Sequence, residues 1–84
     1  MERRIELLKV LMEIEGNKYF ASHTYFIDED GDKIISINFF LGEQNQGVNA
    51  RNEVVDLLES KGFQNIGRNT SIMDGITQAS FIVE

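Results

Sequence analysis

Apolar side chains recur at helical spacing along the first part of the chain. A helix over residues 2–15 would present one apolar stripe to a core: Ile5, Leu8, Leu11 and Met12. Gly16 follows where a left-handed glycine commonly ends a helix. A second apolar stripe lies beside the first and exceeds what one core contact needs: Leu7, Val10 and Ile14. We therefore expect this second stripe to form an interaction surface.

Four later segments are rich in aromatic and β-branched residues, as strands are. They form two pairs along the chain, residues 18–27 with 33–41 and residues 63–68 with 76–83. Asp30-Gly31 lies between the first pair and Asp74-Gly75 between the second. Each dipeptide is a strong signal for a two-residue hairpin turn, so both pairs are expected to be antiparallel hairpins.

A second helix is expected between the two hairpins. It runs from Asn49, whose side chain can cap the N-terminus, to Lys61, and Gly62 ends it. Its buried face carries Ala50, Val54, Leu57 and Leu58. Residues 42–48 before it have the G-x-x-x-x-G spacing of a phosphate loop but lack the Lys-Ser/Thr that should follow. This segment is therefore expected to be a polar connection.

The predicted element order is α-β-β-α-β-β. We expect an α+β two-layer sandwich, with a four-stranded antiparallel sheet and two helices on one face. Moving the first strand of a ferredoxin-like βαββαβ chain to its C-terminus gives this order, and we prefer that permuted topology to a swapped strand order. It makes 33–41 and 76–83 the central strands. Residues 1–84 form one domain, in which 1–41 and 49–84 are either a degenerate αββ repeat or two solutions to the same local problem.

A two-residue turn at Asp30-Gly31 decides which side chains of the first hairpin share a face. It places Tyr25 opposite Ser36, so the helix-covered face would carry Phe20, Phe26, Ile35, Ile37, Phe39 and Leu41. The open face would carry Tyr19, His23, Tyr25, Ile27, Ile34, Asn38 and Phe40. Three aromatic side chains on a solvent-facing sheet predict a second interaction surface, although strand aromatics also stabilise sheets by packing on one another.

Composition narrows the classes of function. Fourteen acidic and 8 basic residues give a formal net charge of −6, which repels phosphate backbones and makes a nucleic-acid partner disfavoured. The absence of cysteine leaves stability to packing and suits a cytoplasmic protein. Charged residues interrupt the N-terminal apolar pattern, and no run reaches the roughly 18 apolar residues of a membrane span. We expect a cytoplasmic protein without membrane contact.

The stretch FIDEDGDKI, residues 26–34, resembles a calcium loop only in part. Asp28, Asp30 and Asp32 match the first three acidic positions of an EF-hand, but Lys33 stands where glycine is needed and Phe39 where glutamate closes the shell. A hairpin turn explains the aspartate and glycine, so a turn with at most weak adventitious divalent binding is the preferred interpretation.

The single histidine, His23, has no cysteine partners for a common zinc site and no identifiable nucleophile beside it. We therefore expect no enzyme activity, no metal and no cofactor. Aromatic side chains on an open sheet can stack RNA bases, but the basic-Gly-aromatic motif of such domains is missing.

The sequence thus favours a small non-enzymatic protein-binding or regulatory domain, with a protein partner or a homodimer. Size and charge suit a phage or mobile-element inhibitor of a nucleic-acid-handling enzyme. A dimeric small-ligand sensor is the alternative, and a single-stranded nucleic-acid binder comes third. The candidate binding residues are Tyr19, His23, Tyr25, Ile34, Asn38 and Phe40 on the sheet, with Leu7, Val10 and Ile14 on the first helix.

Overall fold

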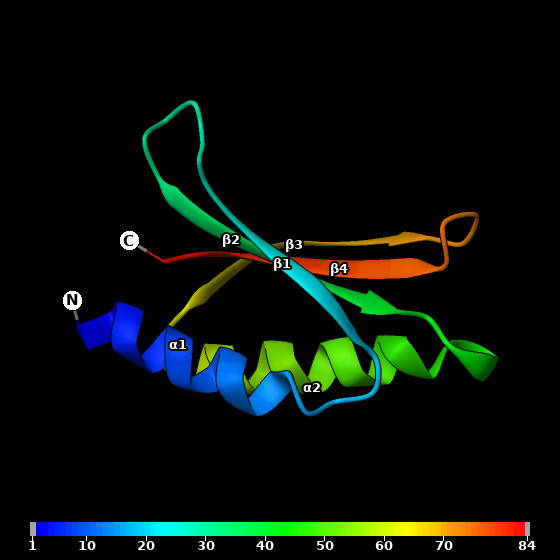
Figure 1. Cartoon of the computed structure of the whole chain (residues 1–84). Coiled ribbons are helices and arrows are strands. Elements are labelled where there is room, and N and C mark those ends of the chain that lie inside the picture. Colours follow the sequence, from blue (N-terminus) through cyan, green and yellow to red (C-terminus); the bar gives the residue numbers. More distant parts are fainter. Residues whose placement is uncertain (1, 84) are drawn as a thin grey trace.

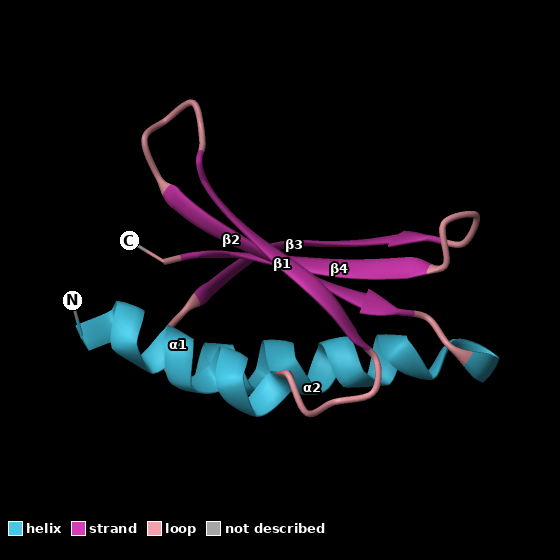
Figure 2. Cartoon of the chain, in the orientation of Figure 1, coloured by secondary structure: helices cyan, strands magenta, loops and turns pink. Residues whose placement is uncertain are grey.

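The computed structural model describes residues 2–83 and forms two layers. Helices α1 (Glu2–Ile14) and α2 (Gln46–Ser60) lie side by side on one face of a single sheet, as Figure 1 shows. The strands are β1 (Phe20–Ile27), β2 (Lys33–Phe40), β3 (Gln64–Ser71) and β4 (Ile76–Ile82). All neighbouring strands are antiparallel, in the order β1-β2-β4-β3 (Figure 2). The predicted α+β class, with a four-stranded antiparallel sheet and two helices, is confirmed.

The core lies between the helices and the two central strands. Phe39 of β2 and Phe81 of β4 are fully buried, and they belong to one apolar cluster with Val55 and Leu58 of α2. Burying side chains of this size contributes about 1.5–3 kcal/mol each. Since the chain has no disulfide, this cluster is the main source of stability.

Helix α1 turns the opposite stripe to the core from the one expected. Leu7, Val10 and Ile14 retain only 3%, 1% and 4% of their accessible surface, so the prediction that they are an exposed interaction surface was wrong. With the buried Leu11 they occupy positions i, i+3, i+4 and i+7, which is a complete helical face of branched aliphatic side chains. The exposed stripe is therefore Ile5, Leu8 and Met12.

The first hairpin is shifted by one residue from the predicted pairing. Tyr25 pairs with Ile35 and Thr24 with Ser36. The turn explains the shift, because the Asp28 N–H donates to the Asp32 carbonyl (3.0 Å) and leaves a loop of three residues rather than two. The Gly31 N–H donates to the Asp28 carbonyl at 3.1 Å, and Gly31 has a φ of 85°. This is a type I turn closed by a glycine bulge.

The shift exchanges the faces of β1. His23, Tyr25 and Ile27 lie on the helix side of the sheet rather than on the open face, and Phe26 lies on the open face opposite Ile34. An irregularity in the pairing between Phe20 and Ser22 returns Phe20 to the helix side of the sheet. Phe20 therefore packs against the core as predicted. On β2 the predicted faces are correct.

Glycines were predicted to end both helices in a left-handed conformation, and only Gly62 at the end of α2 does so. Gly62 has a φ of 89°, its N–H donates to the Glu59 carbonyl, and the Phe63 N–H reaches back to the Leu58 carbonyl. This is the Schellman arrangement expected for the end of α2. Gly16 does not adopt a left-handed conformation, because α1 ends through the Asn17 N–H, which donates to the Ile14 carbonyl at 2.7 Å.

Helix α2 begins earlier than predicted, at the end of a short 3-10 turn, η1 (Glu43–Asn45). Gly47 makes this possible, because its N–H donates to the Leu41 carbonyl at 2.7 Å and its Cα lies directly against the Phe40 carbonyl. A side chain at this position would overlap that carbonyl oxygen. Asn49 consequently lies inside the first turns of α2 and is not its cap.

The first testable prediction concerns this close approach. Gly47→Ala should lower the free energy of unfolding by about 2–3 kcal/mol, because the new methyl group forces α2 away from β2. Gly67→Ala in β3 is the matched control, since an added Cβ meets nothing within 4 Å there. That change should alter stability by less than about 1 kcal/mol. Urea unfolding of both variants measures the difference, and equal effects would contradict the packing described here.

Candidate functional site

Helix α1 and strand β1 together form one side of the molecule with exposed apolar side chains. On α1, Ile5, Leu8 and Met12 keep 54%, 55% and 73% of their accessible surface. On β1, Tyr25 and Ile27 are also exposed, at 39% and 64%. We call this surface the α1–β1 side, defined by Ile5, Leu8, Met12, His23, Tyr25 and Ile27.

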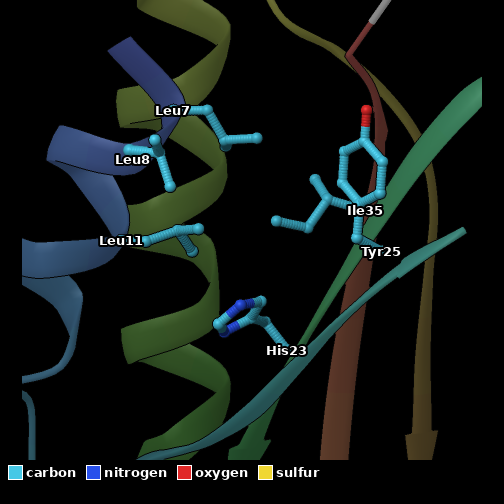
Figure 3. Close-up of a pocket in the computed structure, with 6 residues that line it drawn as sticks. All are labelled: Leu7, Leu8, Leu11, His23, Tyr25 and Ile35. Atoms are coloured by element: carbon cyan, nitrogen blue, oxygen red, sulfur yellow. The ribbon is translucent and has the colours of Figure 1, made fainter. Parts of the chain in front are cut away.

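A cavity of about 170 Å³ separates the helix from the strand on this side. In Figure 3, Leu7, Leu8 and Leu11 project from α1 toward His23, Tyr25 and Ile35 of the sheet. Leu8, at the middle of the exposed stripe of α1, reaches this cavity, so this part of the stripe lies toward the β1 edge. The cavity is smaller than the roughly 300–1,000 Å³ of ordinary small-molecule pockets. It is better suited to one or two side chains of a partner than to a whole ligand.

His23 has mainly apolar surroundings in this cavity. Its ring lies 6.3 Å from that of Phe20 and tilts by 30°, and the leucines of α1 lie across from it. Tyr25 is the one other polar side chain that lines the cavity among the described residues. A general base needs a reacting group within hydrogen-bond reach, so this arrangement favours packing over proton transfer.

Strand β1 is also an outer edge of the sheet, and its sequence does not protect it. FASHTYFI has no lysine, arginine, carboxylate or proline over 8 residues. Natural edge strands usually carry such residues, because an unprotected edge accepts further strands. The opposite edge, β3, contains the charged Arg68. Each of the two edges has one irregularity in its pairing, between Phe20 and Ser22 in β1 and between Asn65 and Gly67 in β3. Of the two edges, β1 is the one suited to strand addition.

The open face of the sheet is less apolar than the sequence suggested. Its centre is a ladder of polar side chains, with Ser36 and Ser80 hydroxyls 2.7 Å apart and Gln78 donating to Asn38 Oδ1 at 2.9 Å. Asn38 also donates to Ser22 Oγ at 3.2 Å. These contacts separate Phe26 at one end of β2 from Phe40 at the other. The structure therefore places no continuous aromatic patch on this face within residues 5–83.

The remaining predicted site residues are dispersed. Phe40 and Asn38 lie on the open face as expected, and Ile34 lies there too but is buried, at 2% exposure. Tyr19 lies at the end of the sheet, where its hydroxyl donates to Gln46 Oε1 at 3.2 Å and its ring packs beside Gly42. Tyr19, Tyr25 and Phe40 do not share one face, so base stacking by three aromatics has no common platform.

A hollow of about 350 Å³ lies on the open face, at the end of the sheet where Phe40 pairs with Ile76. Its lining residues are Asn38, Asn69, Ser71, Asp74, Ile76 and Gln78. Several of these side chains already bond one another, since Ser71 Oγ donates to Asp74 Oδ2 at 2.7 Å and Gln78 bonds Asn38. The hollow thus offers a ligand few groups that are not already engaged.

The acidic hairpin tip brings the carboxylates of Asp28, Asp30 and Asp32 within 4.8 Å of one another. One Asp28 oxygen, Oδ1, accepts the backbone N–H groups of Asp30 (3.0 Å) and Asp32 (2.9 Å), which is the role of a turn residue. Three carboxylates at an exposed tip fall short of the six to eight oxygens that calcium takes. The residues fit a turn better than a metal site.

Arg51 of α2 is a feature that the sequence reading missed. Only 8% of its surface is exposed, and it donates from Nη1 to Thr77 Oγ1 (2.8 Å) and from Nε to Asn52 Oδ1 (3.1 Å). Within residues 5–83 no carboxylate pairs with it. Desolvation, and then the nearby positive charge of Arg68, lower the pKa of Arg51. The spacing of Arg51, Val54, Val55 and Leu58 could have revealed that this arginine points inward.

The second prediction tests this buried network. Thr77→Val keeps the shape of a fully buried side chain but removes the oxygen that accepts from Arg51. We expect a loss of about 1–3 kcal/mol in unfolding free energy, because the buried guanidinium loses its shortest hydrogen bond. Thr24→Val, at an exposed position of β1, should change stability by less than about 0.5 kcal/mol. Comparable losses at both sites in urea unfolding would contradict a role for the network.

The third prediction concerns the hairpin tip. Calcium titration followed by NMR shifts of Asp28 to Asp32 should show no saturable binding tighter than about 1 mM, because too few oxygens converge there. Asp30→Asn serves as the comparison, since it removes one carboxylate and keeps the turn contacts of Asp28. Tighter binding that this change abolishes would show a true metal site.

Neither helix in the described part of the chain combines the length and the apolar character needed to cross a membrane.

In comparison with known proteins, the chain matches no family model, no curated protein sequence and no solved structure, so its function must be argued from its own residues.

Proposed function

We propose that this chain is a non-enzymatic protein-interaction domain that binds through the α1–β1 side. The observation that carries the proposal is the exposed stripe of Ile5, Leu8 and Met12 beside an unprotected edge strand. Each feature alone is common on small proteins. Together they give one continuous surface that offers both apolar side chains and a sheet edge to a partner.

In the proposed mechanism, the partner buries apolar surface of this chain and no bond is made or broken. An apolar side chain of a partner fills the cavity between Leu8 and Tyr25, and the stripe of α1 loses its contact with water. Removing apolar surface from water gives about 25 cal/mol per Å², and strand pairing at β1 adds direction. The apolar walls around His23 support this mechanism over acid–base catalysis.

The topology supports a related proposal about the fold. Placing β4 before α1 in chain order would convert αββαββ into βαββαβ, and the strand order β1-β2-β4-β3 would then be that of a ferredoxin-like sheet. The two central strands are the most buried, as that arrangement requires. We therefore propose a circularly permuted ferredoxin-like domain.

A site-specific photo-crosslinker tests the proposed surface, and this is the fourth prediction. The photoreactive residue replaces Met12, which is exposed and has no role in the core, in cells that naturally make the chain. We expect a covalent adduct with a protein after illumination. The matched control carries the same residue at Asp56, an exposed position of α2.

The two positions distinguish binding through the α1–β1 side from binding through the exposed face of α2. An adduct from position 12 and none from position 56 supports the α1–β1 side as the interface. No adduct from position 12, or equal adducts from both positions, would overturn it. The mass of the adduct also shows whether the partner is another protein or a further copy of the chain.

A further inference from the structure

Resting on the proposed function, we propose that the partner of the α1–β1 side is a second copy of this chain. Two copies join by antiparallel pairing of their β1 edges, so that two four-stranded sheets become one. The same two-fold axis brings the Ile5–Leu8–Met12 stripe of each α1 against its counterpart. Both exposed features are covered in one self-complementary interface.

The backbone of β1 has the orientation that pairing needs. The hydrogen bond from the Asp28 N–H to the Asp32 carbonyl sets which residues bond the neighbouring strand. From Ser22 to Ile27, the even-numbered residues of β1 bond β2. Odd-numbered residues such as His23 and Ile27 therefore direct their main-chain groups to the outer edge. Their side chains lie on the helix side, where the second copy's α1 would also lie.

Charge gives the pairing its direction. Lys18 lies two residues before β1, and the acidic tip with Asp28, Glu29, Asp30 and Asp32 follows directly after it. Antiparallel pairing of two β1 strands centred on His23, whose main-chain groups face outward, sets the tip of one copy beside Lys18 of the other, twice. Parallel pairing would set tip beside tip and lysine beside lysine. The edge is complementary to itself in the antiparallel sense only.

The charge-free stretch between these ends matters as well. Each copy has a net charge of −6, so contact between copies is opposed on most of their surfaces. Along β1 there is no charged side chain from Phe20 to Ile27, and the α1 stripe is apolar. The α1–β1 side is therefore a surface on which two acidic copies can meet without bringing carboxylates together.

The size of the interface predicts a weak dimer. An eight-residue strand is about 27 Å long, and the sheet layer and the helix layer beside it are each about 10 Å thick. This side covers roughly 500 Å² per copy, which is at the low end for specific interfaces. We expect dissociation constants in the micromolar range, and a monomer–dimer equilibrium that shifts with concentration.

The fifth prediction concerns the mass of the protein in solution. Light scattering after gel filtration measures this mass over a concentration series up to about 500 μM. The mass should rise from 9.6 kDa toward twice that value. Leu8→Lys puts a charge on the stripe, and His23→Pro removes an outward N–H from the edge strand. Each should weaken association by at least about tenfold.

A matched control and a charge exchange complete the design. Ile72→Lys changes an equally apolar side chain, 78% exposed, in the loop between β3 and β4, and should leave association unchanged. Lys18→Glu should weaken the dimer about two- to thirtyfold, since two ion pairs are lost by symmetry. The double variant Lys18→Glu with Glu29→Lys should regain most of the affinity, because the charges are again opposite. If Lys18→Glu weakened the dimer only by disturbing the structure around residue 18, the second substitution would not restore the affinity. Circular dichroism checks that each variant is folded.

Each result decides a separate point. A dimer that Leu8→Lys and His23→Pro both dissociate, and that the charge exchange restores, supports the proposal. A monomer at every concentration overturns the second copy as partner, and so does a dimer that neither variant weakens. Failure of the charge exchange overturns the antiparallel arrangement. The photo-crosslink from position 12 fails or succeeds independently, so a monomer that crosslinks to another protein leaves the proposed function intact.

Discussion

The carboxylate of Asp28 sets the geometry on which the surface of this protein depends. By accepting two backbone N–H groups it holds a three-residue loop, and an odd loop moves β1 by one position relative to β2. Since neighbouring side chains on a strand point to opposite faces, that single step sends His23 and Tyr25 toward α1 and Phe26 away from it. Both His23 and Tyr25 line the cavity beside α1.

The two helices play different parts above the same sheet. Helix α2 lies over the central strands and is anchored through Gly47 and the buried Arg51, which bonds Thr77 in β4. Helix α1 lies toward β1 and buries one stripe while a second remains in solvent. Stability is concentrated around α2, and the surface available to a partner is concentrated around α1.

Much of the architecture could be read from the sequence, because local signals agree with one another. The strand segments, the glycine stop at Gly62 and the apolar character of the central strands all follow from composition and spacing. Two structural features could not be predicted from the sequence. Helix α1 has two apolar stripes, and which one is buried depends on how the sheet and α2 fit against it. The pairing of β1 depends on the side chain of Asp28, whereas Asp30-Gly31 by itself indicates a shorter turn.

The charged residue Arg68 on β3 bears on how far association through sheet edges could proceed. A sheet with two receptive edges can add copies at both ends and grow into a filament. Strand β3, the edge opposite β1, carries Arg68, and a charged residue on an edge strand discourages a neighbouring strand. If two copies pair through β1 as proposed, each has used its uncharged edge strand in that one pairing, and growth would terminate at a closed pair.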